Sequence, residues 1–131
     1  MIATTKWIAA VVGVTAFVCL AQAQDSPGRK EMKRTDLTGT KMEVILSTGE
    51  YKPGDFIFRH IHHGEEAFYV LEGATVETPD GKQIELKTGS GSINLRDVPH
   101  GGFKVVGDKT LKLVTVHIVD KGAPLYDAPP K

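Results

Sequence analysis

The chain has 131 residues, of which 40% are apolar and 24% charged, and its 16 Lys and Arg residues balance 16 Asp and Glu residues. This length predicts one compact domain. A formal charge of zero without a long basic run argues against binding to nucleic acid or to an anionic membrane surface. The apolar content and the small number of prolines, 7, argue against intrinsic disorder.

Residues 1–23 have the three parts of a secretory signal peptide. Lys6 precedes a nearly unbroken apolar run from Trp7 to Ala21, and small residues stand before the expected cleavage after Ala23. The run is shorter than the roughly 20 residues that cross a bilayer. We therefore expect a periplasmic or secreted protein without stable membrane insertion, an uncleaved N-terminal anchor being the alternative. The only cysteine, Cys19, lies within the signal, so the mature chain forms no disulfide.

Residues 24–41 form a polar N-terminal arm that carries a cluster of cations, namely Arg29, Lys30, Lys33 and Arg34. The simpler interpretation is a solvated arm. The alternative is an arm that pairs with a neighbouring subunit, because terminal strands of barrels are often exchanged between subunits. A homodimer is the expected assembly.

Residues 42–119 show alternation of apolar and polar side chains with period two and no sustained helical spacing, which predicts strands. The expected strands are Met42–Leu46, Asp55–His62, Glu66–Leu71, Ala74–Thr78, Gln83–Leu86, Ser92–Leu95, Gly102–Val106 and Leu111–Val119. Asp80-Gly81 lies between two of them and predicts a tight hairpin turn. An all-β sandwich or barrel is therefore expected. Residues 120–131 contain prolines that interrupt a sheet ladder, so we expect an extended C-terminal tail on the surface.

The histidines are clustered. Of the five in the chain, three lie at positions 60, 62 and 63. On a strand, His60 and His62 share a face about 7 Å apart, so both can bind one ion. Glu66 opens the next strand after a short turn and can return a carboxylate to the same point. His100, which follows Pro99, can supply a fourth ligand from a rigid approach. This combination predicts a metal site.

The stretch from Gly54 to Gly73 resembles the first motif of the cupin family, GX5HXHX3EX6G. The motif is complete, with His60, His62 and Glu66 at its ligand positions. The resemblance implies a single cupin β-barrel of the jelly-roll type over residues 42–119. It also implies that a divalent metal is held inside this barrel by His60, His62, Glu66 and His100.

The second cupin motif, GX5PXGXXHX3N, is met only in part. Gly89 and His100 occupy their positions, whereas Leu95, Asp97 and Lys104 replace the proline, the glycine and the asparagine. The metal ligand His100 is retained, but the three replacements could change the shape of the loop that precedes it.

Three imidazoles and one carboxylate suit one divalent transition metal, Fe, Mn, Ni, Cu, Co or Zn, and the ligand set does not single one out. An octahedral ion with four protein ligands keeps two positions for substrate or oxygen. The resemblance to small quercetinase-like cupins implies dioxygenase chemistry on an enol, diketone or aromatic substrate, with Glu66 as a catalytic residue. The alternatives are a non-catalytic module that binds the metal or a small ligand, and a lyase or isomerase with Lys104 or Glu65 as its base.

Regular alternation from the ligands predicts which side chains share the cavity. Phe56, Phe58 and Phe68 would face inward and bind substrate. We assume that two sets of aliphatic side chains also face inward: Met42, Val44 and Leu46, and Val114, Val116 and Ile118. Such a wall disfavours sugars, because each unpaired buried hydroxyl costs about 1–3 kcal/mol. The alternative is that these side chains simply fill a small barrel.

The sequence also predicts the positions of four polar or aromatic residues near the ligands. Lys104 shares parity with His100 and would anchor an anionic substrate from inside the cavity. His63 is expected in solvent on the turn, and Tyr69 is expected to point outward. His117 is expected to be a structural residue.

Overall fold

The computed structural model describes residues 26–131, and the expected signal peptide lies outside them. In this range the chain forms nine strands: β1 (Arg29–Asp36), β2 (Met42–Tyr51), β3 (Phe56–Ile57), β4 (Gly64–Glu72), β5 (Ala74–Glu77), β6 (Gln83–Leu86), β7 (Gly91–Asn94), β8 (Phe103–Val106) and β9 (Leu111–Asp120). The expected all-β class is confirmed. None of residues 26–131 belongs to a helix with the length and apolar character needed to span a membrane.

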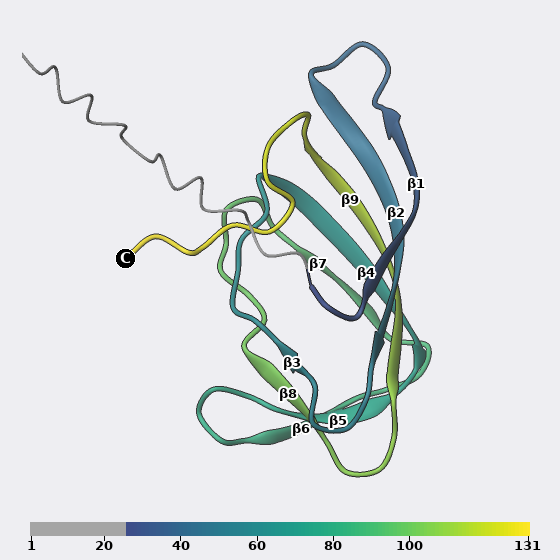
Figure 1. The fold of residues 1–131 in the computed structure, drawn as a ribbon, viewed down its shortest axis with the longest axis vertical. Helices are drawn as coiled ribbons and strands as arrows, with labels where there is room; N and C mark the ends of the chain where they lie inside the picture. The colour runs from purple at the N-terminus through teal and green to yellow at the C-terminus, as the bar shows by residue number, and fades with distance from the viewer. Residues whose placement is uncertain (1–25) are drawn as a thin grey trace, which may run out of the picture.

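Two antiparallel sheets face each other. The larger has the order β1-β2-β9-β4-β7 and the smaller the order β3-β8-β5-β6. In Figure 1 the long strands of the larger sheet run side by side, and the shorter strands of the smaller sheet lie across the lower end. β1 and β2 share the larger sheet and β5 and β6 share the smaller one, but every other pair of successive strands is divided between the sheets. The segment that carries His60 and His62 is one of those that cross from one sheet to the other.

The apolar core fills one end of the space between the sheets. It consists of buried residues from both sheets, namely Tyr51, Val70, Ala74, Val76, Val105 and Leu111. The hairpin between β5 and β6 forms as expected, with Gly81 at a φ of 80° and a hydrogen bond of 2.8 Å from the Thr78 amide to the Lys82 carbonyl. The core leaves the other end of the barrel to polar side chains.

The N-terminal arm is largely a strand. β1 pairs with β2 in register from Arg29 opposite Gly49 to Asp36 opposite Glu43, with one irregularity between Glu31 and Lys33. Most of the strand is exposed on its outer edge, and Arg29 is the exception. The sheet therefore begins at Arg29, before the barrel boundary expected at Met42.

The inward faces of β2 and β9 are the reverse of those we assumed. Val44 and Leu46 on β2, and Val116 and Ile118 on β9, lie on the outer face, whereas Ser47 and His117 are fully buried inside. The same correction applies to Met42 and Val114. Both faces of these strands carry apolar residues, so alternation alone does not identify the inner one. The pairing of Ile45 with His117 and of His117 with Glu66 places all three on the inner face.

The expected strand Asp55–His62 is not continuous. β3 ends at Ile57, and regular pairing resumes only as two isolated bridges, His60 with His100 and Ile61 with Asp127. The second bridge belongs to the C-terminal tail. Tyr126 in this tail is only 9% exposed, so the tail is docked onto the barrel and not simply laid on its surface.

Candidate metal centre

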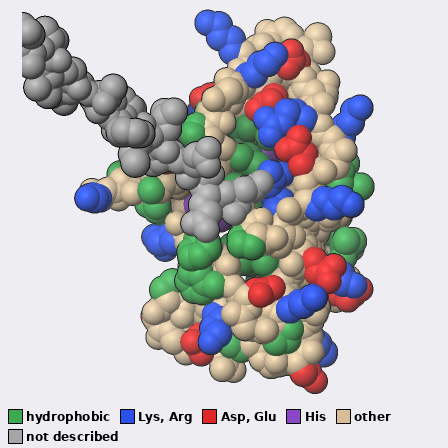
Figure 2. All heavy atoms as spheres, viewed as in Figure 1, with side chains coloured by type: hydrophobic (Ala, Val, Ile, Leu, Met, Phe, Trp, Pro, Cys, Tyr) green, Lys and Arg blue, Asp and Glu red, His purple; other side chains and the backbone are tan. Residues whose placement is uncertain are grey.

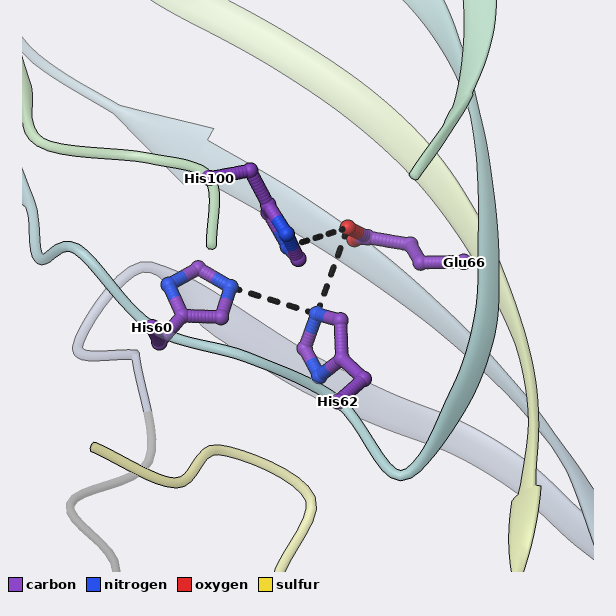
Figure 3. A group of neighbouring side chains, drawn as sticks. All are labelled: His60, His62, Glu66 and His100. Atoms are coloured by element: carbon purple, nitrogen blue, oxygen red, sulfur yellow. Dashed lines mark hydrogen bonds and ion pairs between the residues drawn. The ribbon is translucent and has the colours of Figure 1, made fainter. Parts of the chain in front are cut away.

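Four side chains from three segments converge at the polar end of the barrel. His60 and His62 come from the segment between β3 and β4, Glu66 from β4, and His100 from the loop before β8. One ligand atom from each lies within 4.8 Å of all the others, and His60, His62 and Glu66 are buried. Figure 3 shows the three imidazoles and the carboxylate pointing toward a common centre. The structure brings together the four residues that the sequence predicted.

The ring nitrogens of the three histidines divide their roles in the same way. Each Nδ1 faces a backbone carbonyl: that of Phe58 for His60 at 2.6 Å, that of Val98 for His100 at 2.9 Å, and that of Leu125 for His62. Since a carbonyl oxygen only accepts hydrogen bonds, each Nδ1 carries the proton and donates it. Each Nε2 therefore presents a lone pair to the centre, which is the state of a neutral metal ligand.

The arrangement of these lone pairs fits a cation. The Nε2 atoms of His60 and His62 are 3.2 Å apart, and Glu66 Oε2 lies 3.3 Å from His62 Nε2 and 3.5 Å from His100 Nε2. Within residues 26–131, His100 Nε2 is buried without a hydrogen-bond partner. Facing lone pairs repel and a buried orphan acceptor is costly, and both problems are removed by an ion among them. The donor set, three nitrogens and one oxygen, suits a divalent transition metal.

The protonation states agree with this geometry. Burial lowers the pKa of His60 to about 4, so the ring is neutral at physiological pH. Burial opposes ionisation of Glu66, but the imidazoles of His100, His117 and His62 outweigh it and hold the pKa of this carboxyl well below its usual range. The site therefore offers a negative charge at Glu66 and a neutral ring at His60 near pH 7.

Two residues that contact Glu66 were not predicted as part of the site. Asn94 on β7 lies opposite Glu66 and donates a hydrogen bond from Nδ2 to Oε2 of 2.7 Å. His117 on β9 also lies opposite Glu66, with its Nε2 3.3 Å from Oε1. No local sequence pattern identifies them, because strand pairing brings both residues opposite Glu66. They hold the carboxylate from both neighbouring strands.

The loop before His100 brings this histidine to the centre despite its departures from the cupin motif. Asp97, which stands where the motif has glycine, adopts a φ of 57°. Aspartate tolerates this left-handed conformation better than most side chains. The Asp97 amide donates to the His62 carbonyl at 3.0 Å, and its carboxylate lies 2.8 Å from His63 Nδ1. The loop is thereby tied to the segment that carries two of the ligands.

Gly101 allows this loop to pass close to the ligand segment. Its φ is 77°, and a Cβ at this position would lie 2.4 Å from the Phe58 carbonyl oxygen and 3.2 Å from His60 Nδ1. A side chain here would collide with the hydrogen bond that orients His60. Glycine is therefore required beside His100 by both space and backbone conformation.

A cavity of about 190 Å³ adjoins the centre. His60, Glu66 and His100 form part of its wall, and most of the remaining wall is apolar, including Ile57, Phe68, Leu86, Phe103, Leu111 and Leu113. Phe68 lines the cavity as expected. Tyr126 of the tail also lines this cavity, with its ring centroid 4.6 Å from that of His60 and 5.0 Å from that of His62.

Three of the expected cavity residues lie elsewhere. Phe56 and Phe58 are 43% and 49% exposed and do not line the cavity, because the chain leaves the strand after Ile57 and the alternation is not maintained up to His60. Lys104 is exposed, because Gly101 and Gly102 both have positive φ and break the alternation that was extended from His100. On β8 the inward residue is Val105, which is fully buried.

The remaining expectations have mixed outcomes. Tyr69 points outward as expected. His63 is not simply solvated, because it lies between the carboxylates of Asp97 and Asp127, which raise its pKa through hydrogen bonds. Neither residue considered as a base for lyase chemistry reaches the cavity: Lys104 is exposed, and Glu65 lies on the outer face next to the inward Glu66.

The two-sheet barrel and its three-histidine, one-carboxylate cluster define a small β-barrel with a candidate metal centre. The Cupin domain family matches residues 44–117, and the chain belongs to the cupin family. No curated protein matches the sequence.

Solved structures with the same fold include proteins of different descriptions. One is an uncharacterized conserved protein with a double-stranded β-helix domain from Klebsiella pneumoniae, with 21% identity and a TM-score of 0.53 over 82% of this chain and 91% of that one. Another is the polyketide cyclase RemF from Streptomyces resistomycificus, with 27% identity and a TM-score of 0.51 over 87% of this chain and 83% of that one. They support the fold.

Proposed function

We propose that this cupin is a metal-dependent enzyme that acts on a small enol, diketone or aromatic compound by dioxygenase-type chemistry. The observation that carries the proposal is the position of the ligand cluster in the wall of a largely apolar cavity. A redox-active divalent metal, when bound, supplies Lewis acidity and a route to oxygen chemistry. The chain's own residues orient the ligands, admit an apolar substrate and exclude water.

The ligand residues divide the work between them. The three protonated Nδ1 atoms donate to backbone carbonyls, which keeps each Nε2 aimed at the centre. Glu66 is held by Asn94 and His117 and provides the negative charge that offsets part of the metal's charge. The low pKa keeps this carboxyl ionised at neutral pH, which is the state that binds a cation, and this is the catalytic role we propose for Glu66.

The size of the cavity limits the substrate. Pockets for drug-sized ligands occupy about 300–1,000 Å³, and this one is about 190 Å³. A short diketone or a single aromatic ring is therefore favoured over a three-ring flavonol. The same small volume also favours the second candidate, a module that binds the metal or a very small ligand without turnover.

Oxygen uptake by the metal-loaded protein distinguishes the two. Residues 24–131 would be loaded separately with Fe(II), Mn(II), Co(II), Ni(II), Cu(II) or Zn(II) and assayed with pentane-2,4-dione, catechol and a flavonol. We expect uptake with at least one redox-active metal and a loss of at least a hundredfold in Glu66→Gln. A matched control is Glu65→Gln, one residue away on the outer face, which should leave the rate unchanged. Metal binding without turnover for any combination would favour the binding module.

The expected assembly, a homodimer, has a candidate surface. The outer face of the larger sheet carries four apolar side chains in one row across neighbouring strands, namely Leu46, Val116, Ala67 and Ile93. Ile93 is 62% exposed, and the neighbouring Tyr69 is also exposed. In a dimer with two-fold symmetry, this apolar strip would pack against the same strip of the second copy, and both would be buried.

On the face shown in Figure 2, acidic and basic side chains are interspersed, which supports a small-molecule ligand over nucleic acid.

A further inference from the structure

Asn94 on β7 both contacts Glu66 and lines the cavity. Its Nδ2 donates the hydrogen bond of 2.7 Å to Glu66 Oε2. Since a carboxylate only accepts hydrogen bonds, the nitrogen of the amide, and not its oxygen, faces Glu66. This contact fixes the orientation of the planar amide and directs Oδ1 away from Glu66. In the part of the chain that the structure describes, Asn94 Oδ1 accepts no hydrogen bond.

The strand that carries Asn94 lies at an open edge of the barrel. β7 is the last strand of the larger sheet, so no further strand of this sheet covers it. Asn94 is half-buried, and Ser92, which also lines the cavity, is exposed. Solvent therefore reaches the cavity wall on this side. A ligand that fills the cavity displaces water from Oδ1, and the lost hydrogen bond is costly unless the ligand replaces it.

Other polar groups of the wall surround the ring of Phe68. Ser92 on β7 and Thr115 on β9 both lie opposite Phe68, and all three residues line the cavity. Thr115 is only 6% exposed, and within residues 26–131 its Oγ1 is buried without a hydrogen-bond partner. Asn94 is two residues, or about 7 Å, beyond Ser92 on the same face of β7. A planar ring packed against Phe68 would therefore meet hydrogen-bonding groups at its edges.

We propose that Asn94 is a substrate-binding residue whose Oδ1 accepts a hydrogen bond from a hydroxyl group of the ligand, beside the ligand cluster. This inference rests on the proposed function and narrows its substrate class to enols and hydroxylated aromatic rings. A diketone in its keto form carries only acceptors and would leave Oδ1 without a partner. A site built for a hydroxyl group discriminates against an analogue that lacks it, because a polar group of the site is then left unpaired.

The test compares resorcinol with 3-fluorophenol, in which fluorine replaces one hydroxyl group at nearly equal size. The two substituents are meta to each other, so resorcinol does not chelate a single ion. Residues 24–131 would be loaded with Zn(II), which is not redox-active, and binding of 3-fluorophenol would be followed by fluorine NMR with resorcinol as the competitor. We expect resorcinol to bind about four- to tenfold more tightly, as for one additional neutral hydrogen bond.

Three variants separate recognition of the ligand from support of Glu66. In Asn94→Leu the preference should fall to about twofold, the statistical factor for two equivalent hydroxyl groups. Asn94→Asp keeps an acceptor oxygen but loses the amide that donates to Glu66, so it should keep the preference although it binds Zn(II) less tightly. Gln83→Leu removes an exposed amide on β6 and should change neither property.

The proposal is overturned if neither compound binds, if the wild-type preference does not exceed twofold, or if Asn94→Leu retains it. It is also overturned if Asn94→Asp loses the preference as completely as Asn94→Leu, because Asn94 would then act only through Glu66. Oxygen uptake without an Asn94-dependent preference refutes this inference alone. The preference without oxygen uptake for any metal refutes only the proposed function.

Discussion

Deleting the C-terminal tail from Pro124 onward is expected to weaken metal binding by ten- to hundredfold. The deletion removes the Leu125 carbonyl that accepts the proton of His62 Nδ1, and the Tyr126 ring that covers His60 and His62. Without this acceptor the His62 ring can rotate or change tautomer, so its Nε2 lone pair is no longer held toward the centre. The tail thus contributes to the site although none of its residues is a metal ligand.

The magnitude follows from the contacts that are lost. Removing the hydrogen-bond partner of a ligating histidine costs about ten- to hundredfold in metal affinity, or about 1.4–2.7 kcal/mol. Folding stability should fall as well, because the tail makes two backbone hydrogen bonds between Ile61 and Asp127, of 3.0 and 3.1 Å, and buries most of Tyr126. Tyr126→Ala keeps the backbone carbonyl, so its effect on affinity should be smaller than that of the deletion.

The assay is a competition between the protein and a chromophoric chelator for Zn(II), with circular dichroism to verify the fold of each variant. The control is a deletion of residues 129–131, which lie beyond the contacts with His62 and Ile61. If the longer deletion folds and binds Zn(II) within twofold of the full-length mature chain, the assigned role of the Leu125 carbonyl is wrong.

The remaining predictions concern acid stability, assembly and processing. Burial lowers the pKa of His60 to about 4 and also lowers that of His117, so the unfolded chain binds more protons than the folded chain between about pH 6.5 and 4. The free energy of unfolding of the metal-free protein should therefore decrease as the pH is lowered through this range, by up to about 3 kcal/mol from His60. The raised pKa of the more exposed His63 acts in the opposite direction and only partly offsets this loss. Urea unfolding at pH 7.0, 5.5 and 4.5 measures this, and a flat profile would contradict it. Ile93→Asp on the outer face should convert a homodimer into a monomer in sedimentation analysis, whereas Lys30→Asp should not; a wild-type monomer would exclude the proposed interface. Export of the full-length chain from a bacterial host should yield a mature protein that begins at Gln24 by N-terminal sequencing, and an intact Met1 would favour the uncleaved anchor.

The sequence alone determined the class of fold and the four candidate ligands. Period-two alternation and Asp80-Gly81 are local properties, so the strands and the hairpin could be read directly. The ligands could be read because the spacing of His60, His62 and Glu66 is itself a property of one short segment. His100 was predicted from its position after Pro99 and agrees with the partly met second motif, and Asp97, which stands where that motif has glycine, adopts a left-handed φ of 57°.

Only the tertiary structure decided which side chains face the ligands across the barrel. Phe56, Phe58 and Lys104 were misplaced because alternation was extended through Phe58–Arg59 and Gly101–Gly102, where the chain is not in a strand. Asn94 and His117 were missed because each is brought to the site by pairing with a strand distant in sequence. Register between strands depends on packing of the whole barrel, so it leaves no signal in a single local stretch of residues.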